Sequence, residues 1–462
     1  MDKYHKFYSS LDKAVTRFRE WDISKTIHVI SHLDADGISA CAILINVLNE
    51  ENRKYSISIL QQLTREKIEE IAKEDHKYVI FADLGSGQLK DISNLLKEKE
   101  ILILDHHQPE DASAANICHI NPHLFEIDGS KEIAGSGVVY LFARALSKEN
   151  EKLAHLAIIG AIGDIQEEEG FMRLNKEILE TAVKQSKITV EKGLRLFGRN
   201  TKPLHKVLEY STDPYIPGVT GSESGAIQFL HQIGIEPKNG KQWKKIVHLD
   251  DEEMKRLVVG IIMKRFGETN PEDVLGDIYI LTEEEEESPT RDAKEFATLL
   301  NACGRMDNAS FGIGACLGIE KDKQRAIETL TEYKKQIVNA INWYHDNKHN
   351  MAKGKGFVII NAKDNIPSTI IGTLASILSK SSGIEEGTYV LSIARSNDKM
   401  SKASLRVAGL RGQDIDLRDI IKEIVAKSGG EAGGHKHAAG AWIETDKEEI
   451  FLETAKEILS RK

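Results

Sequence analysis

Acidic and imidazole side chains follow three short apolar segments in the first quarter of the chain. They are His32, Asp34 and Asp36 after one segment, Asp83 after the next, and Asp105, His106 and His107 after the third. A further aspartate, Asp164, follows the apolar segment 153–163. Carboxylates brought together shift each other's pKa values strongly, and divalent cations would resolve that conflict. Mixed carboxylate and imidazole ligands suit Mn²⁺ better than Ca²⁺ or structural Zn²⁺.

The segments that must position these groups predict parallel β-strands. Residues 26–32, 55–63, 77–84 and 100–107 contain short, continuous, β-branched apolar runs, which are typical of strands buried on both faces. Amphipathic helical segments separate them, and this alternation predicts an α/β fold with a doubly wound parallel sheet. Ligands of such sheets bind beyond the carboxyl ends of the strands. We therefore expect the clusters to meet at one edge of the sheet.

Each of these residues, taken alone, also has a plain structural explanation. Asp and Gly are common in turns after strands, so Asp83 could be a turn or cap residue. Asp105 could be a capping residue beside two solvent-facing imidazoles, and Asp164 could be a helix N-cap. Four such coincidences at four corresponding positions are much harder to accept. The set as a whole therefore favours a metal site.

The motifs HLDADG, FADLG, LILDHHQP and GAIGD resemble, in order and spacing, the four motifs of the DHH phosphoesterase superfamily. The resemblance implies two Mn²⁺ ions, with Mg²⁺ as a possible substitute, that share Asp83 as a bridging ligand. It gives one ion Asp34, with His32 assisting, and the other ion Asp36, His106 and Asp164. Some relatives have Asp at the position of His32, so the ligand role of His32 stays open.

The same resemblance implies roles for the two remaining residues of the third cluster. Asp105 would orient the neighbouring histidines, and His107 would face the substrate phosphate as an electrostatic stabiliser or a proton donor. The expected reaction is hydrolysis of a phosphodiester by an activated water, with two cations stabilising the attacking and leaving oxygens. No covalent enzyme intermediate is required.

Three motifs in the C-terminal third indicate how a substrate would be held. The segment EAGGHKHAAGAW resembles the glycine-rich signature of the DHH-associated domain, and LLNACGRMDNAS and SKASLR resemble elements of RecJ nucleases. The residues that this resemblance assigns to substrate phosphate are Arg305, Ser404, Arg406, Gly433, Gly434 and His435. The alternatives are a surface salt bridge for Arg305 and a strand-edge position for Arg406. Residues 395–411 are also basic and could follow a nucleic-acid backbone.

The order of the segments predicts four regions. They are a catalytic domain (1–185), a largely helical middle region (186–298), connecting helices that carry Arg305 (299–350), and a smaller C-terminal α/β domain (351–462). Residues 166–215 are expected to be a mostly helical connector. The middle region has no evident counterpart in bacterial relatives, and the chain looks like the compact archaeal type of RecJ.

The amino-acid composition limits the class of protein and its location. The 462 residues are 40% hydrophobic and carry a net charge of −10, which argues mildly against a general nucleic-acid coat protein but not against an enzyme. The four cysteines follow no zinc-binding spacing. No apolar run is long enough to span a membrane, and the N-terminus lacks the apolar core of a signal peptide. We expect a cytoplasmic protein with no membrane partner.

Together these features predict a Mn²⁺-dependent exonuclease of the RecJ kind that acts on single-stranded DNA, with RNA left open. The resemblance also implies a role in replication or repair and a replisome partner, such as a GINS or helicase component. One alternative is a phosphoesterase for short oligoribonucleotides or adenosine 3′,5′-bisphosphate, and another is a replisome scaffold with little activity. The chain length and Arg305 favour the exonuclease, and its polarity stays open.

Overall fold

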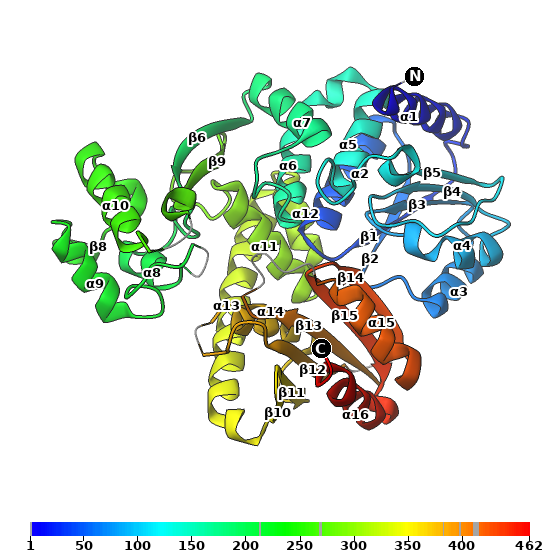
Figure 1. Cartoon of the computed structure of the whole chain (residues 1–462). Coiled ribbons are helices and arrows are strands. Elements are labelled where there is room, and N and C mark those ends of the chain that lie inside the picture. Colours follow the sequence, from blue (N-terminus) through cyan, green and yellow to red (C-terminus); the bar gives the residue numbers. More distant parts are fainter. Residues whose placement is uncertain (1, 212–213, 268–269, 382, 397–398, 410–414) are drawn as a thin grey trace. The chain divides into compact units, whose positions relative to one another are not determined.

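The computed structural model describes residues 2–211, 214–267, 270–381, 383–396, 399–409 and 415–462 (Figure 1). The chain divides into two compact units, Met1–Leu330 and Thr331–Lys462. The boundary falls within the long helix α13 (Glu320–Asn347).

The first unit is built on a five-stranded, fully parallel sheet in the order β2-β1-β3-β4-β5. Its strands are β1 (Ile27–His32), β2 (Tyr55–Leu60), β3 (Tyr78–Ala82), β4 (Glu100–Leu104) and β5 (Ile117–Ile120). The first four strands and the parallel sheet confirm the sequence prediction. The short fifth strand was not predicted, because its residues are mostly half-buried and form no long apolar run.

Helices cover both faces of this sheet. The helices of the first unit are α1 (Lys3–Arg19), α2 (Ala35–Glu50), α3 (Arg65–Lys73), α4 (Leu89–Leu95), α5 (Gly135–Leu146), α6 (Ala154–Gly163), α7 (Arg173–Lys184), α8 (Leu204–Glu209), α9 (Glu223–Gln232), α10 (Asp251–Lys264), α11 (Ala293–Arg305), α12 (Ala309–Cys316) and α13. On one face, Ile30 and Phe81 of the sheet pack with Ile68 of α3 and Ile92 of α4 in a buried apolar cluster. Helices α2 and α5 lie on the other face (Figure 1).

The middle region has its own small apolar core and a two-stranded ribbon. Buried residues of α8, α9 and α10, among them Leu208, Phe229 and Ile261, form this core. Strand β6 (Ile188–Leu194) pairs antiparallel with β9 (Leu275–Leu281), and β7 (Lys238–Asn239) pairs with β8 (Gln242–Trp243). The expectation of a mostly helical connector was wrong over β6. Four of its seven residues are exposed, so the segment lacks the apolar alternation that signals a strand.

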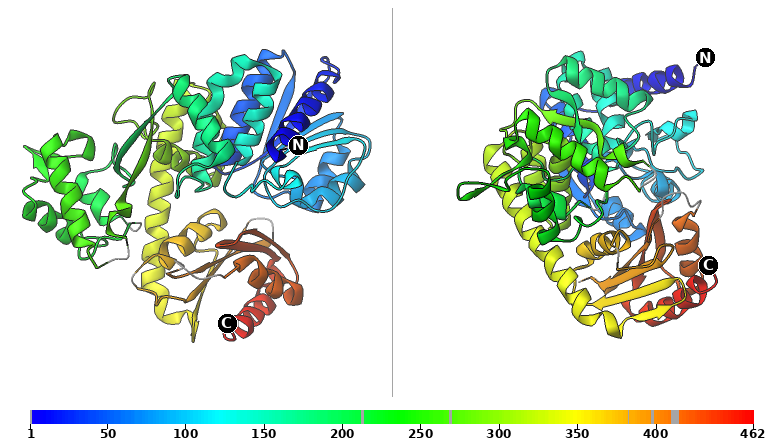
Figure 2. Two further views of the ribbon diagram at one scale, coloured as in Figure 1. Left: turned by 45° about the horizontal axis from the view of Figure 1, so that its top comes forward. Right: turned by 60° about the vertical axis from the view of Figure 1, so that its left-hand side comes forward.

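The second unit is a mixed six-stranded sheet in the order β10-β11-β12-β13-β15-β14. Its elements are β10 (Ala352–Gly354), β11 (Phe357–Lys363), α14 (Ser368–Ser379), β12 (Tyr389–Arg395), β13 (Met400–Val407), α15 (Leu417–Ser428), β14 (Glu431–His435), β15 (Ala438–Glu444) and α16 (Glu448–Leu459). Helix α14 lies on one face, and α15 and α16 cover the other (Figure 2). This unit confirms the predicted C-terminal α/β domain.

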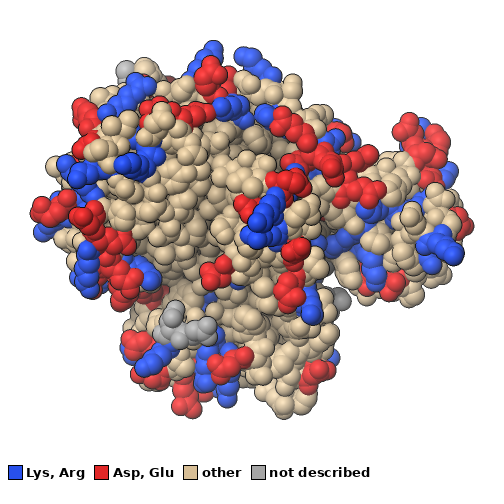
Figure 3. All heavy atoms as spheres, turned by 180° about the vertical axis from the view of Figure 1, so that it is seen from behind, with Lys and Arg blue, Asp and Glu red and all other residues tan. Residues whose placement is uncertain are grey.

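Charged side chains of both signs are dispersed over the surface. On the face that Figure 3 shows, acidic and basic groups are interspersed around an expanse of uncharged residues. Within the described residues, no helix combines the length and the apolar character that a membrane span requires.

Candidate metal centre

The first two carboxylates of the site lie where β1 passes into α2. Asp34 is the N-cap of α2, and its side chain accepts a hydrogen bond of 3.0 Å from the backbone N–H of Gly37. Asp36 lies in the first helical turn and is fully buried. The backbone N–H groups of Gly135 and Ser136, at the start of α5, donate to its two oxygens at 2.7 and 2.9 Å. The positive end of the α5 dipole therefore faces the Asp36 carboxyl group and fixes its position.

Asp83 occupies the turn directly after β3. Its backbone has φ of +59°, which is uncommon for a residue other than glycine, and its N–H donates to the carbonyl of Leu104. The side chain is 1% exposed. An ordinary turn aspartate points to water, whereas Asp83 is turned inward and buried in the centre of the cluster.

Asp105, His106 and His107 follow β4, and hydrogen bonds fix the direction of each ring. Asp105 accepts the backbone N–H groups of Ser86, His106 and His107, and it lies 2.8 Å from Nδ1 of His107. Nδ1 of His106 lies 2.7 Å from the carbonyl oxygen of Gly129. That contact makes Nδ1 the protonated nitrogen of neutral His106, so its Nε2 carries a free lone pair.

The structure brings the predicted metal ligands together around Nε2 of His106. This atom lies 3.3 Å from Asp83, 3.3 Å from Asp164 and 3.7 Å from Asp36. Nδ1 of His32 lies 2.8 Å from Asp34 and 3.8 Å from Asp83.

Three overlapping groups of three possible ligands result. Two of them correspond to the predicted pair of sites, namely His32, Asp34 and Asp83, and Asp36, His106 and Asp164; the third consists of Asp83, His106 and His107. Asp164 caps the C-terminal end of α6, so its alternative role as an N-cap does not apply. This grouping has the form that a pair of cations sharing one carboxylate requires.

Burial and mutual repulsion set the protonation of these groups. Burial raises the pKa of Asp83 well above its usual value, and the charges of Asp36 and Asp34 raise it further. Burial also raises the pKa of Asp164, again with a contribution from Asp36. Burial opposes the charged form of His106, but Asp83 and Asp164 outweigh it and raise the pKa of this imidazole. The carboxyl groups of Asp83 and Asp164 thus hold protons more tightly than free aspartates do, and a cation would compete with these protons.

Asp34 and Asp105 lie next to imidazoles and behave in the opposite way. Burial alone would raise the pKa of Asp34, but the adjacent His32 and the Gly37 N–H lower it below the usual range. Burial would likewise raise the pKa of Asp105, but His107, His106 and the Ser86 N–H lower it. Asp105 is therefore ionised and able to orient His107.

The hydrogen bonding of these residues indicates whether they fit a divalent cation. Both oxygens of Asp83 and Nε2 of His106 are buried, and none of the three has a hydrogen bond within the described part of the chain. A buried polar atom without a partner costs about 1–3 kcal/mol, more when it is charged. Cations that bind between these atoms would satisfy them all. Asp34, Asp36, Asp83, His106 and Asp164 are the oxygen and nitrogen donors that would hold them.

Glycines make room for this arrangement. A side chain at Gly135 would collide with the carboxylate of Asp83, and one at Gly160 would collide with Asp36 and Ser136. The sequence prediction missed both glycines and Ser136. The segment 132–147 was expected to be helical, but nothing in the sequence showed that the start of this helix reaches Asp36.

Arg305 lies at the C-terminal end of α11, and this helix contacts the loop that carries Asp34. The side-chain oxygen of Asn301 accepts a hydrogen bond of 3.1 Å from the N–H of Ala35. Gly304 approaches the carbonyl of Leu33 so closely that any side chain would collide with it. Within the first unit, Arg305 is thus carried by a helix anchored to the loop that holds Asp34. Asn301 belongs to the quoted motif, yet its contact was not predicted.

The predicted phosphate-binding residues of the second unit lie on neighbouring strands. Ser404 is paired with Gly440 of β15, and Gly440 is paired with Gly433 of β14, so these three stand in line across the sheet. Nε of Arg406 donates to the hydroxyl of Ser376 in α14 at 2.9 Å.

The other predicted residues of this unit are placed as follows. Gly434 follows Gly433 in β14 and has φ of +118°, a conformation that favours glycine. The backbone of His435 belongs to β14, and its side chain lies outside the described residues. Arg395 of the basic segment forms ion pairs with Asp364 and Glu448, which reduces its availability for a nucleic acid. Arg411 lies outside the described residues.

Comparison with known proteins identifies the family. Residues 26–163 match the DHH family N-terminal domain, residues 196–277 the DHH-CID domain, and residues 354–461 the DHHA1 domain. An uncharacterized protein of Methanocaldococcus jannaschii is 33% identical over 94% of this chain and 93% of its own length. The chain belongs to the DHH family. The middle region, for which the sequence suggested no bacterial counterpart, thus matches a known domain.

Solved structures share the fold of this DHH protein at low identity. RecJ from Thermus thermophilus in complex with Mn²⁺ matches with a TM-score of 0.59 at 16% identity, over 98% of this chain and 55% of that one. The present chain therefore spans little more than half of that RecJ. Exonuclease RecJ bound to manganese matches with 0.58 at 16% identity, over 98% and 95%. Cdc45 from Entamoeba histolytica matches with 0.64 at 11% identity, over 100% and 99%.

Proposed function

We propose that this DHH-family protein is a Mn²⁺-dependent exonuclease that hydrolyses single-stranded DNA. The observation that carries the proposal is the convergence of Asp34, Asp36, Asp83, His106 and Asp164, whose buried donor atoms include three without hydrogen bonds among the described residues. A phosphodiesterase that uses two cations needs such a set. Membership of a family of phosphoesterases agrees with it.

The residues of the chain have distinct tasks in this proposal. When bound, a pair of divalent cations supplies a nucleophile at neutral pH and offsets the charge that develops on the phosphate. Asp83 lies between the two ligand groups, and α5 holds Asp36 in place. His107 is 36% exposed and is oriented by Asp105, so it can donate a hydrogen bond or a proton to a phosphate oxygen.

Substrate phosphates are assigned to separate groups in each unit. In the first unit, Arg305 is positioned by α11, and its planar guanidinium suits bidentate contact with a phosphate. In the second unit, Ser404, Arg406, Gly433, Gly434 and His435 are the corresponding proposed residues. A replisome partner, such as a GINS or helicase component, belongs to the same proposal, and the fold shared with Cdc45 supports it.

Digestion of end-labelled strands tests the activity directly. The full chain would be incubated with matched single-stranded DNA and RNA, labelled at either end, in Mn²⁺ and in Mg²⁺. We expect stepwise release of nucleotides from one end of the DNA in Mn²⁺. The label position that gives immediate mononucleotide release reports the polarity, and the RNA arm reports the sugar preference.

Two alternative functions give different results in the same assay. A phosphoesterase for small substrates would hydrolyse a dinucleotide or adenosine 3′,5′-bisphosphate faster than a long strand. A scaffold would release no nucleotide under any condition. The fold that this chain shares with Cdc45 is the observation that favours this alternative. Either outcome would refute the exonuclease proposal.

A further inference from the structure

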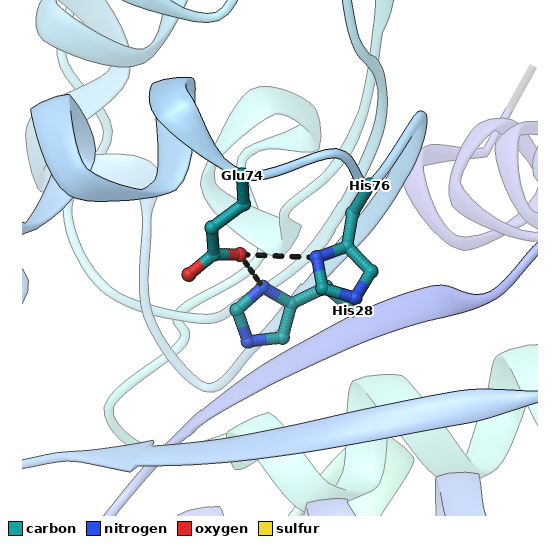
Figure 4. Close-up of side chains that lie close together, drawn as sticks. All are labelled: His28, Glu74 and His76. Atoms are coloured by element: carbon teal, nitrogen blue, oxygen red, sulfur yellow. Dashed lines mark hydrogen bonds and ion pairs between the residues drawn. The ribbon is translucent and has the colours of Figure 1, made fainter.

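A second cluster of metal-binding side chains lies at the amino-terminal edge of the same sheet, away from the strand ends that carry the DHH residues. His28 is the second residue of β1, Glu74 caps the C-terminal end of α3, and His76 lies two residues before β3. Figure 4 shows the two rings next to each other, each with one nitrogen facing the same oxygen of the Glu74 carboxylate. Segments more than 40 residues apart in the sequence therefore supply one ligand-like group.

The donor atoms converge on one point. Nδ1 of His28 lies 2.7 Å, and Nδ1 of His76 lies 3.1 Å, from the same oxygen of Glu74 (Figure 4). All three donor atoms lie within 4.8 Å of one another. Ligand atoms that share a Zn²⁺ at about 2.0–2.1 Å lie about 3.3 Å apart in a tetrahedral site. Small outward movements of the half-exposed glutamate would therefore admit an ion.

Serines of the neighbouring edge strand engage the opposite nitrogens of both rings. Nε2 of His28 lies 2.8 Å from the hydroxyl of Ser58, and Nε2 of His76 lies 3.1 Å from the hydroxyl of Ser56. Ligand histidines are commonly held in this way, because a partner on one nitrogen fixes the ring and leaves the lone pair of the other nitrogen for the metal. Both rings of this cluster have such a partner.

The polar atom that a cation would satisfy belongs to His28. This side chain is 4% exposed, and its Nδ1 has no hydrogen bond among the described residues, although Glu74 lies close by. The approach to the carboxylate is thus short but poorly aligned for N–H donation. Burial lowers the pKa of His28, which favours the neutral form that metals require.

We propose that His28, Glu74 and His76 bind a divalent transition-metal ion of the Zn²⁺ class at the amino-terminal edge of the sheet. Two imidazoles and one carboxylate are a ligand set typical of zinc, and the solvent-facing side leaves a fourth position for water. Since β1 and the α3–β3 connection supply the ligands, the ion would link these two segments.

The positive charge of Lys99, a neighbour of the cluster, disfavours the binding of a cation. Lys99 is nearly buried, and its ammonium donates to the backbone carbonyls of Glu74 and His76 at 2.8 Å each. Its charge is partly balanced by Asp75 and Glu74, and its bonds hold the turn in the geometry that aims both side chains at His28. The hydrogen bonds of Lys99 therefore fix the backbone from which the Glu74 and His76 side chains extend.

The proposal is tested by counting bound metal in an Asp83→Asn background, which weakens metal binding at the other edge. Metal-free protein would be dialysed against Zn²⁺ or Co²⁺, and bound metal measured by elemental analysis. We expect His76→Gln and Glu74→Gln each to lose one equivalent, together with a visible Co²⁺ band typical of low coordination number. His231→Gln is the matched control, because His231 lies beside a single glutamate on the surface.

The alternative is a hydrogen-bonded His–Glu–His network without an ion. In that case both variants and the control would bind the same amount of metal and give the same Co²⁺ spectrum, and this outcome would overturn the proposal. Both substituted residues are partly exposed, so circular dichroism should show an intact fold. The result does not depend on nuclease activity, since the readout is bound metal.

Discussion

The N-terminal sheet carries histidine and carboxylate groups at both of its edges, and the two edges differ in how the chain builds them. At the carboxyl edge, ligands follow the ends of three strands and one helix, and Asp36, Asp83 and His106 are buried. At the amino edge, one strand and one turn supply three groups, two of them partly exposed.

Because of this difference, similar side chains suit different functions at the two edges. Carboxylates dominate the carboxyl edge, where burial, together with the nearby charges of Asp36 and Asp34, raises the pKa of Asp83 and favours the binding of more than one cation. Imidazoles dominate the amino edge, where the cluster has one carboxylate and serine partners. A charge-rich, buried set suits chemistry on a phosphate, and an imidazole-rich set open to water suits a single structural ion.

The largest expected effect comes from Asp83. Asp83→Asn should lower the hydrolysis rate by about 1,000-fold or more, because the loss of a shared ligand removes several kcal/mol of transition-state stabilisation. The metal-free variant should melt no lower than the original protein, since it loses a buried, repelled carboxylate. Rates and melting curves check both statements, with Asp111→Asn, an exposed residue, as the control. A variant with unchanged rates would show that Asp83 does not bridge.

Gly135→Ala tests the carboxyl edge without touching a ligand. The new methyl group would collide with the Asp83 carboxylate and displace it. We expect kcat to fall about 100-fold, as for a displacement of about 1 Å in an active site. Gly87→Ala is the matched control, since nothing lies within 4 Å of its added carbon. Equal rates for the two variants would contradict the packing described for α5.

The affinity for Mn²⁺ should fall as the pH falls. The pKa values of Asp83, Asp164 and His106 are all raised, so each retains a proton that a cation must displace. Each displaced proton makes the affinity change by about tenfold per pH unit below the raised pKa. Calorimetry in buffers of different ionisation enthalpy measures the protons released, and a heat that is independent of the buffer would contradict the prediction.

The same shifts determine the stability of the metal-free protein. Raised pKa values favour the folded state while these groups are protonated, and this contribution is lost as the pH rises through the raised values. Above the ordinary pKa of aspartate, where Asp34 and Asp105 are ionised in both the folded and the unfolded state, the melting temperature without metal should therefore fall with rising pH, and Mn²⁺ should restore it.

The smallest effect is expected at the amino edge, from the serines behind the ligands. Ser58→Ala should weaken Zn²⁺ binding by about tenfold, because His28 loses the partner that fixes its ring. Ser24→Ala is a control at an exposed turn in the same unit. Competition with a chromophoric chelator gives the affinities, and equal values would show that Ser58 does not orient the ligand.

The sequence revealed the carboxyl edge because each cluster there follows an apolar strand. The doubly wound topology alone then predicts that Asp34, Asp83 and His106 share one edge. The amino edge gave no such signal. His28 sits inside an apolar segment and resembles a core residue, while Glu74 and His76 resemble solvent-facing residues at a helix end. Their meeting depends on how α3 returns the chain to the sheet.

Contacts that depend on the packing of helices and strands could not be predicted from the sequence either. The helix α5 was expected, but its N–H groups at Gly135 and Ser136 reach Asp36 only through the packing of α5 against α2. Strand β6 was missed because it is stabilised by its pairing with β9 and has few buried side chains.

The left-handed backbone at Asp83 bears on how such a protein can change over evolutionary time. Asparagine adopts this conformation nearly as well as aspartate, and one base separates their codons. A single mutation can thus remove this candidate ligand while the backbone at the turn keeps its conformation.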